Sequence, residues 1–163
     1  IKHSEDALDG FTKLFGTSNP MTLQATSTHG QILQDLGRYE EAAGVLEKSV
    51  AGFTELVTEK HPRTISAMGK LASVLTSAKQ YDRAIALYKK QIGLAQEVLG
   101  EDHPKTMMAH ANMGSTVYKS GKVAEGIDMM STARAKLIDK LGPDHYFAKG
   151  IVEEIEKAKK LLD

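Results

Sequence analysis

Apolar residues recur three and four positions apart along most of the chain, which is the spacing of one face of an α-helix. Leu71, Val74 and Leu75 follow this spacing in one segment. Ala84 and Leu87 begin the same spacing in the next segment. No segment alternates apolar and polar residues as a half-buried strand does. The pattern therefore predicts an all-α fold of amphipathic helices.

A short motif divides these helices into repeats of 42 residues. His-Pro-Lys-Thr at 103–106 has an earlier copy, His-Pro-Arg-Thr, at 61–64, and a weaker one, Asn-Pro-Met-Thr, at 19–22. The pattern continues as Leu-Gly-Pro-Asp-His at 141–145. Proline suits the first position of a helix, because its φ is already set and its missing N–H is not needed there. Each His-Pro or Asn-Pro pair therefore predicts the start of a helix.

A second motif lies about midway between these starts, at 37–42, 79–84 and 121–126. Gly37 and Gly121 suit a left-handed turn after a helix. A small residue follows five positions later, as close packing of two helices requires. The motif predicts turns near 36–38, 78–80 and 120–122, and hence hairpins of two helices.

Each hairpin can bury its apolar face only against its neighbours, so we expect a right-handed α-solenoid of antiparallel helix hairpins. We expect residues 1–163 to form a single array. Ile1 at the start, in place of methionine, leads us to expect a piece of a longer protein. The array divides into a second helix of a preceding unit with a linker (1–19), repeat 1 (20–61), repeat 2 (62–103), repeat 3 (104–145), and a first helix of a fourth unit or a cap (146–163).

Composition narrows the classes of function. The 163 residues carry 21 Lys and Arg against 21 Asp and Glu, so the chain lacks the basic excess of a nucleic-acid-binding protein. No apolar run approaches the roughly 20 residues of a membrane helix. The absence of cysteine excludes disulfides and thiolate chemistry. We expect a cytoplasmic protein with no nucleic-acid or membrane partner.

The stretch 99–106, LGEDHPKT, places two acids beside a histidine and so invites a metal site or a catalytic base. Its histidine has counterparts at His61 and His145, and repeats stack about 10 Å apart, too far for one metal held at about 2 Å. No Gly-x-Ser-x-Gly or Gly-x-x-x-x-Gly-Lys motif occurs. We therefore predict a structural joint here, with no catalytic, cofactor-binding or metal-binding residue, and a protein that is not an enzyme.

The Gly-x-Tyr-x-x-Ala turn at 37–42 resembles the tetratricopeptide repeat (TPR), whose usual length is about 34 residues. The longer period and the LGEDHPxT joint resemble the kinesin light chain subclass. The chain departs from the pattern at Val123 and Gly126, which stand in place of tyrosine and alanine. His29 and His110 also stand at first-helix positions that are usually apolar in the family. We expect repeats 1 and 3 to pack less tightly than repeat 2 for these reasons.

In this family the first helices of the repeats line a concave groove, and the resemblance indicates which residues face it. These positions are small, amide-bearing or hydroxylated, with few charges, so a peptide or helical segment can pair with them. Asn112 stands where the kinesin light chain pattern carries a cargo-contacting asparagine, and we expect Lys70, Lys119 and Tyr118 to set specificity. The candidate groove residues are Ser27, Gln31, Gln34, Lys70, Ser73, Met108, Asn112, Ser115, Tyr118 and Lys119.

Two other interpretations stay open. The serines and threonines of the first helices could serve only to keep those helices soluble. Alternatively, the chain is a self-association or sensor segment of a larger signalling protein, acting through its convex face or its ends. Terminal half units favour a homo-oligomer, because they expose apolar stripes such as Leu8, Phe11, Leu14 and Phe15.

Overall fold

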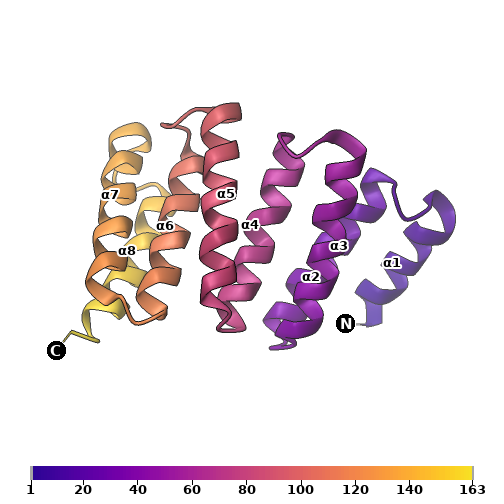
Figure 1. Ribbon diagram of the computed structural model, residues 1–163, viewed down its shortest axis with the longest axis horizontal. Coiled ribbons are helices and arrows are strands. Elements are labelled where there is room, and N and C mark those ends of the chain that lie inside the picture. The colour runs from indigo at the N-terminus through magenta and orange to yellow at the C-terminus, as the bar shows by residue number, and fades with distance from the viewer. Residues whose placement is uncertain (1, 163) are drawn as a thin grey trace. The chain divides into compact units, whose positions relative to one another are not determined.

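The computed structural model of the chain describes residues 2–162, which form eight α-helices and no strand (Figure 1). Three of the helices begin at the prolines that the sequence marks, and the predicted turns fall between helices. The helices are α1 (Lys2–Phe15), α2 (Pro20–Asp35), α3 (Tyr39–Val57), α4 (Pro62–Ser77), α5 (Tyr81–Leu99), α6 (Pro104–Lys119), α7 (Val123–Leu141) and α8 (Tyr146–Lys159).

The described chain forms two compact units, which divide between Gln80 and Tyr81. In the first unit, α2 packs against α1 and α3, and α4 packs against α3 and more lightly against α2. A small apolar core joins α2, α3 and α4, where Phe53 is 2% exposed. Its members are Leu23, Phe53 and Ala67, with Val50 packed against them.

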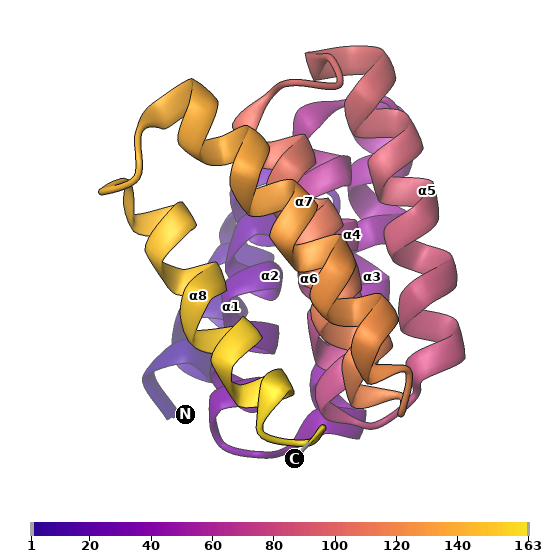
Figure 2. The same cartoon turned by 90° about the vertical axis from the view of Figure 1, so that its left-hand side faces the viewer.

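In the second unit, α6 lies between α5 and α7, and α8 packs against α7 and α6. Figure 2 shows α7 (orange) and α8 (yellow) at the front, with α6 behind α7. Two of the methionines that the sequence concentrates here, Met107 and Met130, are buried and fill this core. The other buried members are Ala111, Tyr118, Ala133, Leu137, Ile151, Ile155 and Ala158.

The LGEDHPKT stretch is a hydrogen-bonded joint between α5 and α6. His103 is the N-cap of α6, and its Nδ1 accepts a hydrogen bond from the backbone N–H of Lys105 at 3.1 Å. The buried Thr106 hydroxyl donates to the carbonyl of Gly100 at 2.9 Å and so closes the loop. The same N-cap recurs at 42-residue intervals, at Asn19, His61 and His145. The histidines therefore act as helix caps, as the structural interpretation predicts.

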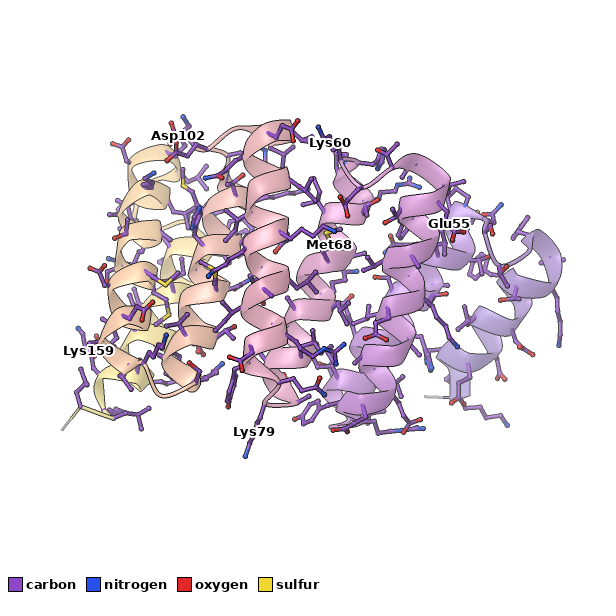
Figure 3. All side chains as sticks on the ribbon, viewed as in Figure 1. Glu55, Lys60, Met68, Lys79, Asp102 and Lys159 are labelled. Atoms are coloured by element: carbon purple, nitrogen blue, oxygen red, sulfur yellow. The ribbon has the colours of Figure 1, made fainter. Side chains whose placement is uncertain are left out.

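A left-handed residue also recurs every 42 residues, but two of these positions lack glycine. Gly100 and Gly142 end helices with positive φ, and Thr58 stands at the equivalent place after α3 with φ 115° and ψ 164°. That region is accessible almost only to glycine. Lys79, in the turn after α4, has φ 58°, and its side chain points away from the helices (Figure 3).

The variant Thr58→Gly is expected to raise the free energy of unfolding by about 1 kcal/mol, because it removes backbone strain of that order. Thermal and urea denaturation followed by circular dichroism would measure the change. The reciprocal variant Gly100→Thr is expected to lower stability. An unchanged or lower stability of Thr58→Gly would show that the threonine is not strained.

The two helices of repeat 3, α6 and α7, pack more closely than the sequence predicts. A Cβ atom added at Gly126 of α7 would lie 2.5 Å from the carbonyl oxygen of Gly114 and 2.6 Å from the backbone nitrogen of Tyr118, both on α6. The two backbones approach each other so closely that alanine does not fit. The expectation of loose packing is therefore wrong here, because the missing methyl group permits a closer contact.

We expect Gly126→Ala to destabilise the protein by about 2 kcal/mol, because the overlap with backbone atoms outweighs the better helix propensity of alanine. Gly44 of α3 is the matched control, since a Cβ there would meet nothing within 4 Å. Gly44→Ala should stabilise by roughly 0.5–1 kcal/mol. Equal effects of the two substitutions on the urea midpoint would contradict the close contact.

Candidate functional site

The predicted groove residues lie on the first helices of the hairpins. In the first unit they are on α2 and α4, and in the second unit they are all on α6. In each unit, hydrogen bonds join several of them to the neighbouring first helix. The residues are therefore parts of polar contacts between helices as well as parts of a surface.

In the first unit, polar side chains join α2 to α4. The Lys70 ammonium donates to the Ser27 hydroxyl at 3.1 Å. The Gln34 amide donates to the hydroxyl of Ser73 at 3.1 Å and to that of Ser77 at 3.0 Å. Lys70 is half-buried, and this burial lowers the pKa of its ammonium group. Partial desolvation makes Lys70 a stronger hydrogen-bond donor than a solvated surface lysine.

In the second unit, Glu154 of α8 gathers the polar side chains of α6. Its Oε2 accepts hydrogen bonds from the hydroxyls of Ser115 and Tyr118, each at 3.2 Å. The Lys119 ammonium lies 3.5 Å from the same oxygen, and the Lys157 ammonium lies 2.9 Å from Oε1. Glu154 is thus the centre of this cluster.

Sequence reasoning missed Glu154. The residue lies 42 positions after Asn112 and therefore occupies the same place in the repeat. Carrying the inner-face positions into the last helix would have found it. Glu154 lies within α8, among other charged residues of that helix, and its own position therefore does not stand out in the sequence.

The cluster is electrostatically coupled. Burial alone would raise the pKa of the Glu154 carboxyl, but the ammonium groups of Lys157 and Lys119 and the Tyr118 hydroxyl together lower it. Burial and the negative charge of Glu154 raise the pKa of the Tyr118 hydroxyl to about 12. The Lys119 ammonium also lies 5.5 Å from the centroid of the Tyr118 ring. At neutral pH the centre therefore holds an ionised carboxylate and a protonated phenol.

We expect Glu154→Gln to lower the free energy of unfolding at pH 7 by about 1 kcal/mol, because the ammonium groups lose their charged acceptor. A carboxyl with a lowered native pKa stabilises the fold above its unfolded pKa, near 4.3, and loses this effect as the pH falls further. The difference between wild type and variant should therefore shrink below about pH 4.

Urea denaturation between pH 3 and pH 7 would check this. Glu153→Gln, on the neighbouring and exposed residue, is the control and should change stability by less than about 0.5 kcal/mol. A difference between Glu154→Gln and wild type that is constant with pH would exclude the ionised cluster.

The ten predicted residues divide by exposure. Gln31, Asn112 and Lys119 are exposed, and are therefore accessible to a ligand. Ser27 and Tyr118 are buried, with exposed fractions of 2% and 7%, so their contribution is to hold neighbouring side chains in place. The remaining five are half-buried: Gln34, Lys70, Ser73, Met108 and Ser115.

Glu101, part of the acid pair in the LGEDHPKT stretch, pairs with Lys136 of α7 at 3.0 Å. The pair borders a cavity of about 290 Å³ that also contains His110. Burial and the charge of Lys136 lower the pKa of His110, although Glu101 opposes them. Among residues 2–162, no group of three or more His, Asp or Glu residues is placed to hold a metal ion.

No helix within residues 2–162 is both long and apolar enough to cross a membrane.

Solved structures share this arrangement of helices. One is a crystal structure, in a variant form, of nearly identical TPR-like repeats from a kinesin light chain of Podosopora anserina. It aligns with a TM-score of 0.76 at 18% sequence identity, and the alignment covers 96% of this chain and 74% of that one. Another structure of those repeats aligns with a TM-score of 0.72 at 17% sequence identity, and the alignment covers 98% of this chain and 85% of that one. The crystal structure of BtubC (BKLC) from P. vanneervenii aligns with a TM-score of 0.69 at 17% sequence identity. This alignment covers 98% of this chain and 71% of that one. These likenesses place the fold in the class of all-α repeat solenoids.

Sequence models narrow the class to a family. Models of the tetratricopeptide repeat match residues 22–63 and 63–135. The chain belongs to the tetratricopeptide repeat family, which confirms the predicted all-α solenoid and the resemblance to this repeat. Its general role is therefore that of a protein-interaction repeat scaffold. No curated protein sequence matches the chain.

Proposed function

We propose that the chain binds an extended peptide or a helical segment of a partner protein on the polar surfaces of its first helices. In the first unit this surface contains Gln31 beside the half-buried Lys70 and Ser73. In the second unit it contains Asn112 and Lys119, with Met108 as the apolar contact. The chain acts as a binding module and not as an enzyme, in the cytoplasm.

The observation that carries the proposal is the contrast between the first and second helices. Exposed positions on the second helices carry many charges, as at Lys48 and Lys89. The first helices instead present exposed amides at Gln31 and Asn112, beside hydroxyl groups. An amide offers both a donor and an acceptor, which matches the pairing needs of a peptide backbone.

The contacts between first helices add to this argument. A ligand group binds more tightly when the side chains it meets are already fixed, because less conformational entropy is lost. Hydrogen bonds hold Lys70 against Ser27, and Ser115 and Tyr118 against Glu154. Ser27 therefore helps to position Lys70, and Tyr118 with Glu154 helps to position Lys119.

We expect Asn112→Ala and Lys70→Glu each to weaken peptide binding at least about tenfold, because each removes a hydrogen-bonding group from the proposed surface. Peptides selected from a displayed random 12-residue library against wild-type protein would serve as probes, with affinities measured by isothermal titration calorimetry. Lys89→Glu, an exposed charge reversal on α5, is the control and should leave affinity unchanged.

If every selected peptide bound both variants as tightly as wild type, the proposed surface would be wrong.

The alternative function, self-association or sensing through the ends, has one supporting observation. Leu14 and Phe15 of α1 are 76% and 48% exposed. The opposite end of the chain also carries exposed apolar side chains, at Leu161 and Leu162, but exposed ion pairs such as Lys159 with Glu156 interrupt them along α8. Peptide binding therefore stays the favoured function.

A further inference from the structure

The second unit contains a cavity of about 290 Å³ lined by α5, α6, α7 and the joint between α5 and α6. His110 of α6 lines this cavity and is half-buried. Met107 and Ala133, which are 2% and 3% exposed, belong to the core of the unit and border the same space. The cavity therefore places an imidazole, a group that can gain a charge in mild acid, directly beside the apolar core.

The preceding repeat has apolar side chains at two of these positions. His110 corresponds to Met68, which is 2% exposed, and Lys136 corresponds to Leu94, which is half-buried. Repeat 3 thus carries two ionisable groups where repeat 2 is apolar. A charged imidazole at a half-buried position loses part of its hydration, which is costly. This difference between the repeats makes the packing of repeat 3 sensitive to pH.

Charged groups act on His110 from the joint and from α7. Glu101 of the joint and Lys136 of α7 form an ion pair with a distance of 3.0 Å, and both interact electrostatically with the imidazole. His110 therefore has one cation and one anion near it, and the anion is already paired. The other polar or charged groups on these elements are Asp102, which acts on Lys136, Asp128 of α7 and the uncharged Gln96 of α5.

The balance of these effects favours the neutral imidazole. Burial and the charge of Lys136 lower the pKa of His110, and Glu101 opposes them only in part. A histidine in water titrates near about pH 6.5. When the pH falls below that value, an opened state with a hydrated imidazole binds a proton before the closed state does. Acid therefore favours the opened state, and the effect stops growing once the pH passes the native pKa.

The contact beside the imidazole is weak enough to open locally. The side chains of Lys136 and Glu101 are 45% and 67% exposed, and exposed ion pairs contribute little to stability. The cavity is polar on this side and large enough for water molecules. The imidazole can therefore be hydrated while the core beneath it stays packed.

We propose that mild acid opens the contact between α7 and the α5–α6 joint through protonation of His110. The protonated ring repels Lys136 and competes with it for Glu101, so the ion pair breaks and water enters the cavity. The device loosens the second unit below about pH 6.5. It does not depend on the proposed peptide binding, because none of the candidate groove residues lines the cavity.

Histidine side-chain NMR of the whole chain tests the electrostatic part. The midpoint of His110 should lie below about pH 6.5. Lys136→Met should raise this midpoint, because it removes the repelling cation and frees Glu101. Glu101→Gln should lower it, because the attracting carboxylate is lost. A wild-type midpoint at or above the ordinary value, or shifts of the same sign in the two variants, would overturn the proposal.

Amide hydrogen exchange in α7, corrected for the intrinsic pH dependence of exchange, measures the opening itself. In wild type the opening equilibrium near Lys136 should rise at least about threefold from about pH 7.5 to about pH 5. His110→Met, which introduces the residue of repeat 2, should abolish this rise, and Lys136→Met should reduce it. His3→Gln, at an exposed histidine of α1, is the control and should behave as wild type does.

Circular dichroism at neutral pH would show that the variants fold. If His110→Met did not fold, the comparison of Lys136→Met with wild type would decide. No rise in wild type, or an equal rise in wild type and the folded variants of these two positions, would overturn the proposal.

Discussion

The structure depends on one constraint: each helix is amphipathic and can hide its apolar face only against helices close to it in the chain. The packing contacts of both units are of this kind, between consecutive helices or between first helices one repeat apart. Nothing in such a fold is held by a distant segment, so the joints must set the geometry locally. The histidine caps, the left-handed residues and the buried threonines of the joints do so at 42-residue intervals.

The same constraint explains why the first helices carry short polar side chains. Two first helices one repeat apart approach along a face that also borders solvent, where apolar contacts would be left half exposed. Hydrogen bonds from Gln34 to Ser73 and from Ser115 to Glu154 join these helices instead. A surface made in this way is fixed and has donors and acceptors beside the groups already paired, which is the basis of the proposed peptide binding.

Much of the fold could be predicted from the sequence, because proline and glycine mark helix ends by fixed backbone preferences. Features without such a mark could not be predicted. Thr58 and Lys79 adopt positive φ only because neighbouring helices require a turn there. Gly126 was expected to weaken the packing, since its role depends on the distance to Gly114. Among the site residues, Glu154 could not be predicted because a charged residue in a helix is usually exposed to solvent.

The central claim is that partner peptides meet the exposed amides of the first helices. The most direct measurement is the side-chain amide signals of a ¹⁵N-labelled sample, recorded by NMR during titration with a selected peptide. The Asn112 and Gln31 side-chain amide signals should shift on binding, while that of Gln96, exposed on α5, should not. A shift of Gln96 with Asn112 and Gln31 unchanged would contradict the claim.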